Sequence, residues 1–359
     1  MERTRLTLRA AQDDEALVEP LLGSWEANMT HAVNRSPVDV CRQRNDPYLI
    51  LGNTGVVRVL RPAREGPTAA EGDICLVLPF GRRDPDGYAE LIHAYDAPGT
   101  HGVLATRTLM PGDGLLPVDP DSRYPLSRWV HYSRYFTAWD NWSVAHACWR
   151  SQMPTADPSS HLVFAWGGGV ALAEVDLARR NGFRTAMTAS SDERLALIGA
   201  LGITPVDRRN YPGLGSEGES SAAIRRSRLS ERALLRLLHE LSDGRGCSVI
   251  IDNIGGPLHP TTLRALGRQG VVSTCGWKAG MRLSVGRATE CQRRHVHVHT
   301  HSWRYEDSPA IRSFSEATGW LAPSEAIDTY SFDDVPRLAQ EYADAKVHSY
   351  FQQFRVNDV

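Results

Sequence analysis

A glycine-rich segment between two apolar runs is the feature that most constrains how this chain can fold. Residues 162–166 form the first run and residues 185–188 the second, and Gly167, Gly168 and Gly169 directly follow the first run. After the glycines the apolar residues adopt the 3.6-residue spacing of a helix. The buried face of that helix is expected to contain Val170, Leu172, Val175, Leu177 and Ala178. The segment therefore predicts one βαβ unit.

A glycine-rich turn of this kind is typical of dinucleotide sites, because backbone N–H groups and the positive helix end face a phosphate. The motif Gly-x-Gly-x-x-Gly needs its last glycine for close packing of helix on strand, and Leu172 stands there, between Ala171 and Ala173. Glu174 and Asp176 are expected near the first helical turn, where carboxylates would compete with a pyrophosphate. The segment predicts a dinucleotide site, and a Rossmann-like layer that binds no nucleotide is the alternative.

The residues after the second and third strands indicate which dinucleotide would bind. Hydroxyl and guanidinium groups stand there in place of the acidic residue that binds the ribose of NAD: Ser190, Ser191, Arg194, Arg208 and Arg209. Arginine makes charge-assisted bonds to phosphate, so these residues favour NADPH over NADH. Asp192 and Glu193 leave open that Arg194 is a solvated arginine with acidic neighbours.

Length and charge exclude several classes of protein. The 359 residues suffice for two domains, and a net charge of −2 without a Lys/Arg block argues against nucleic-acid binding. The 6 cysteines show no CxxC spacing, so neither a disulfide framework nor a zinc site is expected. The N-terminus lacks the apolar core of a signal peptide, and no run approaches the roughly 20 apolar residues of a membrane span. We expect a cytoplasmic protein without a membrane or nucleic-acid partner.

The rest of the chain separates into a β-rich part and an α/β part. Residues 15–25 predict a helix, and residues 125–149 predict an aromatic one. Short strands of a small barrel are expected at 48–60, 73–80, 92–94 and 103–109. A helix is expected at 230–241, with Ser230 as its N-cap and Gly244 ending it. Buried strands and helices then alternate: strands at 247–255, 270–277, 294–303 and 346–356, and helices at 258–266 and 308–318.

Short motifs stand in a characteristic order from Arg44 to His299, within a pattern that covers about residues 45–357. They are Arg44-Asn45-Asp46-Pro47-Tyr48, Gly52, Gly72-Asp73, Trp166-Gly167, Ser190-Ser191 with Arg194, Ala200-Leu201-Gly202, Asp207-Arg208, Thr274-Cys275, and Arg294 leading to His299. This order resembles the medium-chain dehydrogenase/reductase superfamily and, within it, the crotonyl-CoA carboxylase/reductase group. The resemblance implies an α/β protein with a GroES-like β-barrel and a Rossmann-type doubly wound parallel sheet. The expected domains are 1–138 for the barrel, 139–304 for the nucleotide-binding domain and 305–359 returning to the barrel.

The resemblance also implies an activity and residues that carry it. Its members reduce a 2-enoyl-CoA with NADPH, usually as dimers, and CO2 or a proton traps the enolate. His299 matches the active-site histidine that holds CO2 or water, and Asp96, preceded by Tyr95, resembles its acidic partner. The asparagine of the CO2 site would fall near Asn34. The glycine turn is about two residues shorter than the family's and has lost its later glycines, the N-terminal region is shortened, and the acidic residue is Asp and not Glu. Together with the changes after Cys275, these departures argue against reductive carboxylation and, less strongly, against reduction itself.

The segment after residue 274 would line the nicotinamide pocket. Cys275 is expected there as a packed, small apolar group and not as a nucleophile. Gly276, Trp277 and Lys278 replace small polar residues of the family, so Trp277 would fill the pocket and Lys278 would charge it. Lys278 is predicted to stabilise an enolate or thioester oxygen, with a solvated turn lysine as the alternative.

Four alternating histidines, His295, His297, His299 and His301, would point to one side of a strand. They predict a pocket wall lined by imidazoles, with plain surface alternation or a metal site as alternatives. Neither HExxH nor the zinc pattern of alcohol dehydrogenases occurs, so no metal is expected.

The leading hypothesis is an NADPH-dependent reductase of an α,β-unsaturated thioester or related conjugated carbonyl. It would act as a homodimer on a small acyl-thioester or polyketide-like substrate, in polyketide or fatty-acid type secondary metabolism. The alternative is a redox-silent homologue that uses the same cleft for cyclisation or isomerisation, and a non-catalytic subunit is a third class.

Overall fold

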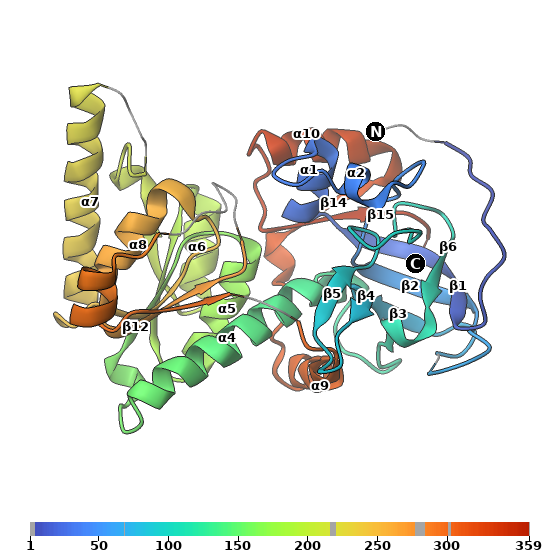
Figure 1. Cartoon of the computed structure of the whole chain (residues 1–359), viewed down its shortest axis with the longest axis horizontal. Helices are drawn as coiled ribbons and strands as arrows, with labels where there is room; N and C mark the ends of the chain where they lie inside the picture. The colour runs from blue at the N-terminus through green and yellow to red at the C-terminus, as the bar shows by residue number, and fades with distance from the viewer. Residues whose placement is uncertain (1–3, 68, 216–219, 277–283, 301–302, 359) are drawn as a thin grey trace. The chain divides into compact units, whose positions relative to one another are not determined.

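The structure, a computed structural model, describes residues 4–67, 69–215, 220–276, 284–300 and 303–358. Contacts between Cα atoms divide the chain into two compact units. The first unit comprises Met1–Phe136 and Trp303–Val359, and the second comprises Thr137–Ser302. These limits lie within two residues of the domain boundaries expected from the sequence, 138/139 and 304/305. Both units are drawn in Figure 1.

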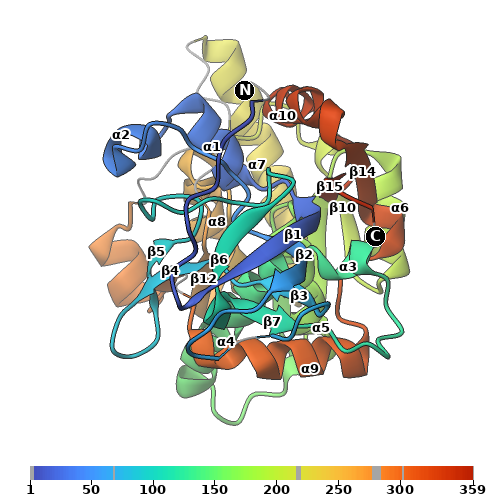
Figure 2. The same cartoon turned by 90° about the vertical axis from the view of Figure 1, so that its right-hand side faces the viewer.

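The first unit is built on a mixed sheet with the strand order β14-β15-β1-β2-β3-β7, and β6 also pairs with β1. The strands are β1 (Glu15–Ser24), β2 (Gly55–Arg61), β3 (Ile74–Val77), β6 (Thr108–Pro111), β7 (Leu115–Pro117), β14 (Ile327–Ser331) and β15 (Phe351–Arg355). A separate antiparallel pair joins β4 (Phe80–Arg83) and β5 (Ala89–Ile92). The C-terminal segment thus completes the sheet that the N-terminal segment begins. Figure 2 shows the antiparallel strands of this sheet toward the viewer.

Helices pack around this sheet. They are α1 (Ala27–Asn34), α2 (Val40–Arg44), α3 (Leu126–Trp129), α9 (Ser308–Thr318) and α10 (Val335–Ala343). Helix α9 has the bounds predicted from the sequence, and its Arg312 donates a hydrogen bond to the carbonyl oxygen of Pro117 at the end of β7. Helix α4 (Tyr132–Gln152) begins in the first unit and continues into the second, as the aromatic segment predicted.

The helix predicted over residues 15–25 is wrong, because this segment is strand β1. Burial alternates along its first half, where Ala16 and Val18 are buried and their neighbours are partly exposed. Pro20 lacks a backbone N–H group, and a proline inside a helix destabilises the helix by about 3 kcal/mol. In the strand it lies at a shift of register against β2, where a proline is tolerated.

Two of the strands expected for the barrel are shorter than predicted. Residues 48–54 and 103–107 are irregular, and they bind each other through backbone hydrogen bonds from Gly102, Val103 and Leu104 to residues 50–52. Gly52 has φ +101, and a Cβ atom there would lie 2.7 Å from the Val103 side chain. The close approach of these two segments therefore replaces regular strand pairing.

The second unit is a parallel sheet with the strand order β10-β9-β8-β11-β12-β13. Its strands are β8 (Leu162–Ala165), β9 (Arg184–Ala189), β10 (Thr204–Asp207), β11 (Cys247–Ile251), β12 (Leu266–Thr274) and β13 (His297–Thr300). The connecting helices are α5 (Gly169–Arg180), α6 (Asp192–Ala200), α7 (Ser221–Leu241) and α8 (His259–Ala265). The strand order reverses between β8 and β11, which is the doubly wound arrangement predicted. The α/β fold class is confirmed.

Helices cover both faces of this sheet (Figure 1). Leu234 and Leu238 of α7 pack in one core cluster with Phe164 of β8 and Ile250 of β11. Residues 171–178 of α5 are all buried, which includes the apolar residues predicted for its inner face. Val170, predicted on that face, is only half-buried in the first turn.

Helix α7 is longer than the helix predicted over residues 230–241. It begins at Ser221, and its N-cap is Ser220, whose side chain accepts a hydrogen bond from the backbone N–H of Ala223. The predicted cap, Ser230, is buried in the middle of the helix and donates its hydroxyl to the carbonyl oxygen of Pro212 at 2.8 Å. The prediction failed because the first turns are polar and rich in arginine, so apolar spacing does not mark them.

Candidate functional site

The glycine-rich turn lies between β8 and α5, at the carboxyl end of the sheet and beside the reversal of strand order. Gly167 donates its N–H to the hydroxyl of Thr188 at 3.2 Å, and a Cβ atom at Gly167 would lie 2.9 Å from the Thr188 carbonyl oxygen. Gly168 has φ +137, and among the residues that the structure describes a Cβ atom there would have no neighbour within 4 Å. Gly168 also precedes α5 without any side-chain cap. Because the N-cap residue offers no side-chain acceptor to the first N–H groups of α5, this helix start has the form that can bind an anion.

A buried hydrogen-bond chain anchors the residue before this turn. Trp166 donates its indole N–H to Thr262 at 2.8 Å, and Thr262 donates to Asp252 at 2.7 Å. The other oxygen of Asp252 accepts the backbone N–H groups of Ile254 and Gly255. Burial acts to raise the pKa of Asp252, but His259 together with these hydrogen bonds outweighs it and the pKa is lowered. The sequence did not indicate this chain, because it joins the ends of β8 and β11 through α8.

The residues expected to choose between NADPH and NADH have different roles in the structure. Ser190 and Arg208 are exposed at the carboxyl ends of the neighbouring strands β9 and β10. Ser191 is the N-cap of α6 and accepts the backbone N–H of Arg194, so its hydroxyl supports the helix. Arg209 is paired with Asp192 and Asp207, at 2.5 Å and 2.8 Å.

The expected competition of Glu174 and Asp176 with a pyrophosphate is wrong. Glu174 is 0% exposed and accepts hydrogen bonds from Ser273 and Asn141. Asp176 is buried and bound by Arg179 and Arg180 at 2.8 Å and 2.9 Å. Because α5 is buried along residues 171–178, both carboxylates turn away from the open start of the helix.

Cys275 lies where β12 ends, next to the end of β11. Its backbone N–H and its thiol both donate to the side-chain oxygen of Asn253, at 2.9 Å and 3.3 Å. The thiol is therefore held by an amide. Trp277 and Lys278 lie outside the described residues, so the roles predicted for them stay predictions.

His299 lies in β13, where its Cα pairs with that of Ser273 in β12. His297 lies two residues before His299 and pairs with Val271. Both histidines therefore occupy the same face of the sheet as Ser273. His295 does not share this alternation, because it precedes the strand with φ +55. The prediction that all four histidines line one side is thus wrong for His295, and His301 lies outside the described residues. Among the described residues, no group of three or more His, Cys, Asp or Glu side chains could hold a metal ion.

Tyr95 and Asp96 belong to the first unit, in a turn after β5. Asp96 accepts the backbone N–H of Ile92 at 2.5 Å, and the buried Arg44 donates to the carbonyl oxygen of Tyr95 at 3.3 Å. Arg44 also pairs with Asp46 at 2.5 Å, which explains the conspicuous motif at residues 44–48. Burial raises the pKa of Asp96, and burial together with the charge of Asp96 raises the pKa of Tyr95. Hydrogen bonds from Arg44 and to Asp96 therefore fix this turn.

A second polar cluster of the first unit was not predicted. Asn28 donates its side-chain amide to Asn53 at 3.2 Å, and Asn53 is 1% exposed. Within the described part of the chain, the Asn28 oxygen and the Asn53 nitrogen lack hydrogen-bond partners. Nearby in sequence, Glu26 accepts the hydroxyl of Ser133 at 2.8 Å. Asn34, expected at the CO2 site, is exposed at the end of α1 instead.

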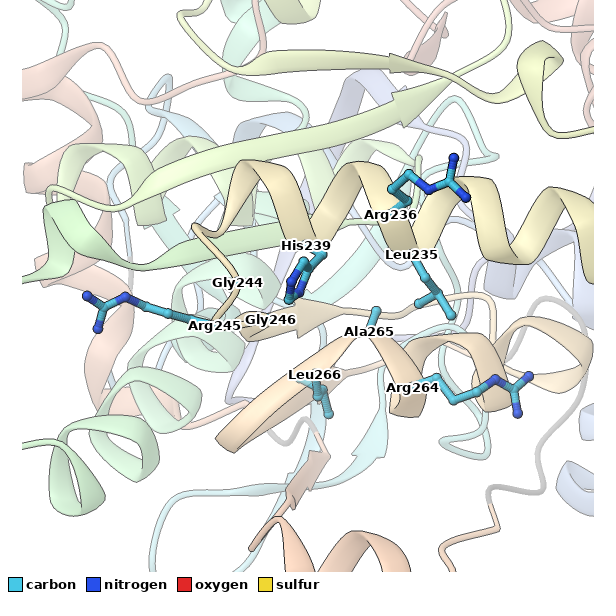
Figure 3. A pocket seen from close by; sticks show the side chains of 9 residues that line it. All are labelled: Leu235, Arg236, His239, Gly244, Arg245, Gly246, Arg264, Ala265 and Leu266. Carbon is cyan, nitrogen blue, oxygen red and sulfur yellow. The ribbon is translucent and has the colours of Figure 1, made fainter.

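A cavity of about 420 Å³ lies in the second unit, away from the glycine turn. Its wall comes from α7, α8 and the amino ends of β11 and β12: Leu235, Arg236, His239, Gly244, Arg245, Gly246, Arg264, Ala265 and Leu266. In Figure 3, Arg236, Arg245 and Arg264 point away from one another. The cavity therefore does not gather their charges, and it lies at the opposite edge of the sheet from the turn.

No helix in the described part of the chain is long and apolar enough to cross a membrane. No family model matches the sequence, and no curated protein matches it.

Solved structures resemble the chain over nearly its whole length. The crotonyl-CoA carboxylase/reductase AntE in complex with NADP is 19% identical with a TM-score of 0.79, covering 99% of this chain and 90% of that one. The 2-octenoyl-CoA carboxylase reductase CinF, in complex with NADP and 2-octenoyl-CoA, is 19% identical with a TM-score of 0.75, covering 98% and 80%. The alcohol dehydrogenase TADH from Thermus sp. ATN1 is 16% identical with a TM-score of 0.75, covering 98% and 95%. The chain therefore has the fold of the medium-chain dehydrogenase/reductase superfamily, with a GroES-like and a Rossmann-type domain as in crotonyl-CoA carboxylase/reductases.

Proposed function

We propose that this chain is an NADPH-dependent reductase of an α,β-unsaturated thioester or a related conjugated carbonyl. The observation that carries the proposal is the open start of α5 at Gly168, beside the reversal of strand order where doubly wound sheets bind nucleotides. Two proteins of similar fold are described as complexes with NADP, and one of them also holds 2-octenoyl-CoA. These relatives favour an acyl thioester as the substrate class.

Particular residues would hold the cofactor. The backbone N–H groups at the start of α5 would bind the pyrophosphate, while Thr188 fixes Gly167. Ser190 and Arg208 would bind the 2′-phosphate of the adenosine. Bound NADPH would supply the hydride for the β carbon of the substrate.

The α carbon of the substrate needs a proton or CO2, and the chain offers groups for that step. His299 and Asp96 are the proposed donors, with Tyr95 beside the acid and Lys278 stabilising the enolate oxygen. Burial raises the pKa of Asp96, which acts in the direction that a proton donor needs. The proposed setting is polyketide or fatty-acid type secondary metabolism in the cytoplasm, with the chain acting as a homodimer and without a metal.

Binding and turnover test this proposal together. The purified chain is expected to bind NADPH in calorimetry and to oxidise it when crotonyl-CoA or 2-octenoyl-CoA is added. Mass spectrometry of the product with and without bicarbonate tells reduction from reductive carboxylation. An absence of NADPH binding at any substrate concentration would exclude the reductase.

The redox-silent alternative is favoured by one observation. Ala171 and Leu172 are 1% exposed where a dinucleotide motif wants glycine, so side chains separate α5 from the sheet. In that case the substrate would be cyclised or isomerised without consumption of NADPH. Product formation in the absence of any nucleotide would support this alternative.

The choice between NADPH and NADH is expected to depend on the exposed Arg208 and the half-buried Arg194. Arg208→Ala should weaken NADPH binding by about tenfold or more and leave NADH binding unchanged, because a charge-assisted bond to the 2′-phosphate is lost. Arg194→Ala should act in the same direction. Arg209→Ala is the matched control, since Asp192 and Asp207 already neutralise this arginine. Calorimetry with both nucleotides measures the effect, and equal losses for all three variants would contradict the assignment.

A further inference from the structure

A carboxyl group is buried inside the second unit where the reaction proposed above does not use it. Glu174 of α5 is 0% exposed, and so are its two partners, Ser273 of β12 and Asn141 of α4. The Ser273 hydroxyl donates to one carboxyl oxygen at 2.5 Å, and the Asn141 amide donates to the other at 3.1 Å. The carboxyl group therefore joins three elements that are distant in sequence.

The position of this contact connects the glycine turn to the strand of His299. Helix α5 carries the turn at its start and Glu174 in its second turn. Ser273 is the β12 neighbour of His299, and both side chains lie on the sheet face that α5 covers. Where a close-packing glycine would normally bring the helix against the sheet, this chain has Leu172. The hydrogen bond between Glu174 and Ser273 thus fixes α5 against β12, a function that a glycine contact serves in the dinucleotide motif.

The contact is suited to a neutral carboxylic acid. Burial raises the pKa of Glu174 to about 8, against the hydrogen bonds from Ser273 and Asn141, and the charge of Asp140 on α4 adds to the rise. The side-chain oxygen of Asn141 has no hydrogen-bond partner within the described residues. A half-turn of the Asn141 amide exchanges its nitrogen and oxygen, and would let a protonated Glu174 donate to that oxygen. Asp176, the other acid of α5, faces Arg179 and Arg180 instead.

We propose that Glu174 is a positioning residue that, as a neutral acid, clamps α5 to β12, and that its ionisation loosens this clamp and weakens NADPH binding. The binding half of the proposal rests on the proposed function. The clamp itself does not.

The raised pKa of Glu174 determines the direction in which pH changes the stability of the folded chain. An acid whose pKa is higher in the folded chain binds more protons when folded, so stability falls as pH rises from the ordinary glutamate value toward about 8. In this window the unfolding equilibrium constant is expected to rise by up to about tenfold per pH unit from Glu174 alone. Above that window the contribution is constant.

The first arm of the test compares stability in wild type and Glu174→Gln between pH 5 and pH 9, by denaturant unfolding. Glutamine has the shape of the neutral acid, accepts from Ser273 and donates to Asn141, so its profile should lack the fall of the wild type. Asp176→Asn is the matched control on the same helix and should keep the wild-type fall. Coincident profiles for wild type and Glu174→Gln would overturn the clamp. Should the variant not fold, infrared absorption of a protonated carboxyl in the wild type, present at pH 6 and lost at pH 9, decides the same point.

The second arm measures NADPH binding at pH 7 and pH 9. If only the neutral form is competent, wild-type affinity should fall by about tenfold over this interval, whereas that of Glu174→Gln should stay level. Parallel losses in both proteins would overturn the positioning role. If NADPH does not bind at either pH, the proposed function and the binding half fail, and the stability arm still decides the clamp.

Discussion

Gly168→Ala is expected to lower NADPH affinity by about 10²-fold. Gly168 has φ +137, a conformation that costs an L residue about 1–3 kcal/mol, and the new methyl group would stand in the open space before α5. Strain and occupied space both act against a phosphate that must approach the backbone closely. Calorimetric titration with NADPH measures the loss.

Two other glycines serve as controls that separate a loss of NADPH affinity from a change in the stability of the chain. Gly72 also has a positive φ, +88, and nothing lies within 4 Å of a Cβ atom there, but it belongs to the first unit. Gly72→Ala should cost similar stability and leave NADPH affinity unchanged. Gly199 lies in α6 with open space around it, so Gly199→Ala should stabilise the chain slightly. If Gly72→Ala weakens NADPH binding as much as Gly168→Ala, strain and not phosphate contact is the cause.

The parts of the fold that the sequence predicted well are those with strong local patterns. Helix α9 was predicted at its observed bounds, and the βαβ unit was predicted because apolar runs flank the glycines. In both, the residues that decide the structure are neighbours in sequence. The resemblance to the family then supplied the barrel, which local patterns describe only weakly.

The failures have a common physical cause. Residues 15–24 contain enough apolar residues for either period, and only the pairing of β1 with β2, β6 and β15 determines that they form a strand. Glu174 was expected near the first helical turn, where it would compete with a pyrophosphate, but it is buried against partners at 141 and 273. Long-range partners decide both cases.

The candidate site likewise contains local features, which the sequence indicated, and long-range features, which it did not. The turn at Gly168 and the exposed ends of β9 and β10 are local, and the sequence indicated them. The anchor formed by Trp166, Thr262 and Asp252 joins segments about a hundred residues apart. Such a chain of hydrogen bonds leaves no local pattern, although a buried strand that ends in an acid is a usable signal for it.

His299→Ala is expected to lower turnover of the enoyl thioester by about 10²-fold or more while the chain stays folded, which is the range for loss of a general acid. His299 lies in β13 and pairs with Ser273 of β12, on the sheet face where Ser273 binds Glu174 of α5, so its imidazole has a defined place on that face. Since the histidine would act on the substrate, NADPH affinity should change little. Product formation and NADPH titration measure the two quantities separately.

His297→Ala is the matched control for this prediction. His297 lies in the same strand and on the same face but pairs with Val271, one step further from the carboxyl end of the sheet. Because nucleotides and substrates meet at the carboxyl ends of parallel strands, the effect should be concentrated at His299. His295 precedes the strand with φ +55, so His295→Ala should alter turnover less than either. Small and equal effects from the three variants would mean that the histidines form a plain surface row and that the proton for the α carbon comes from another group.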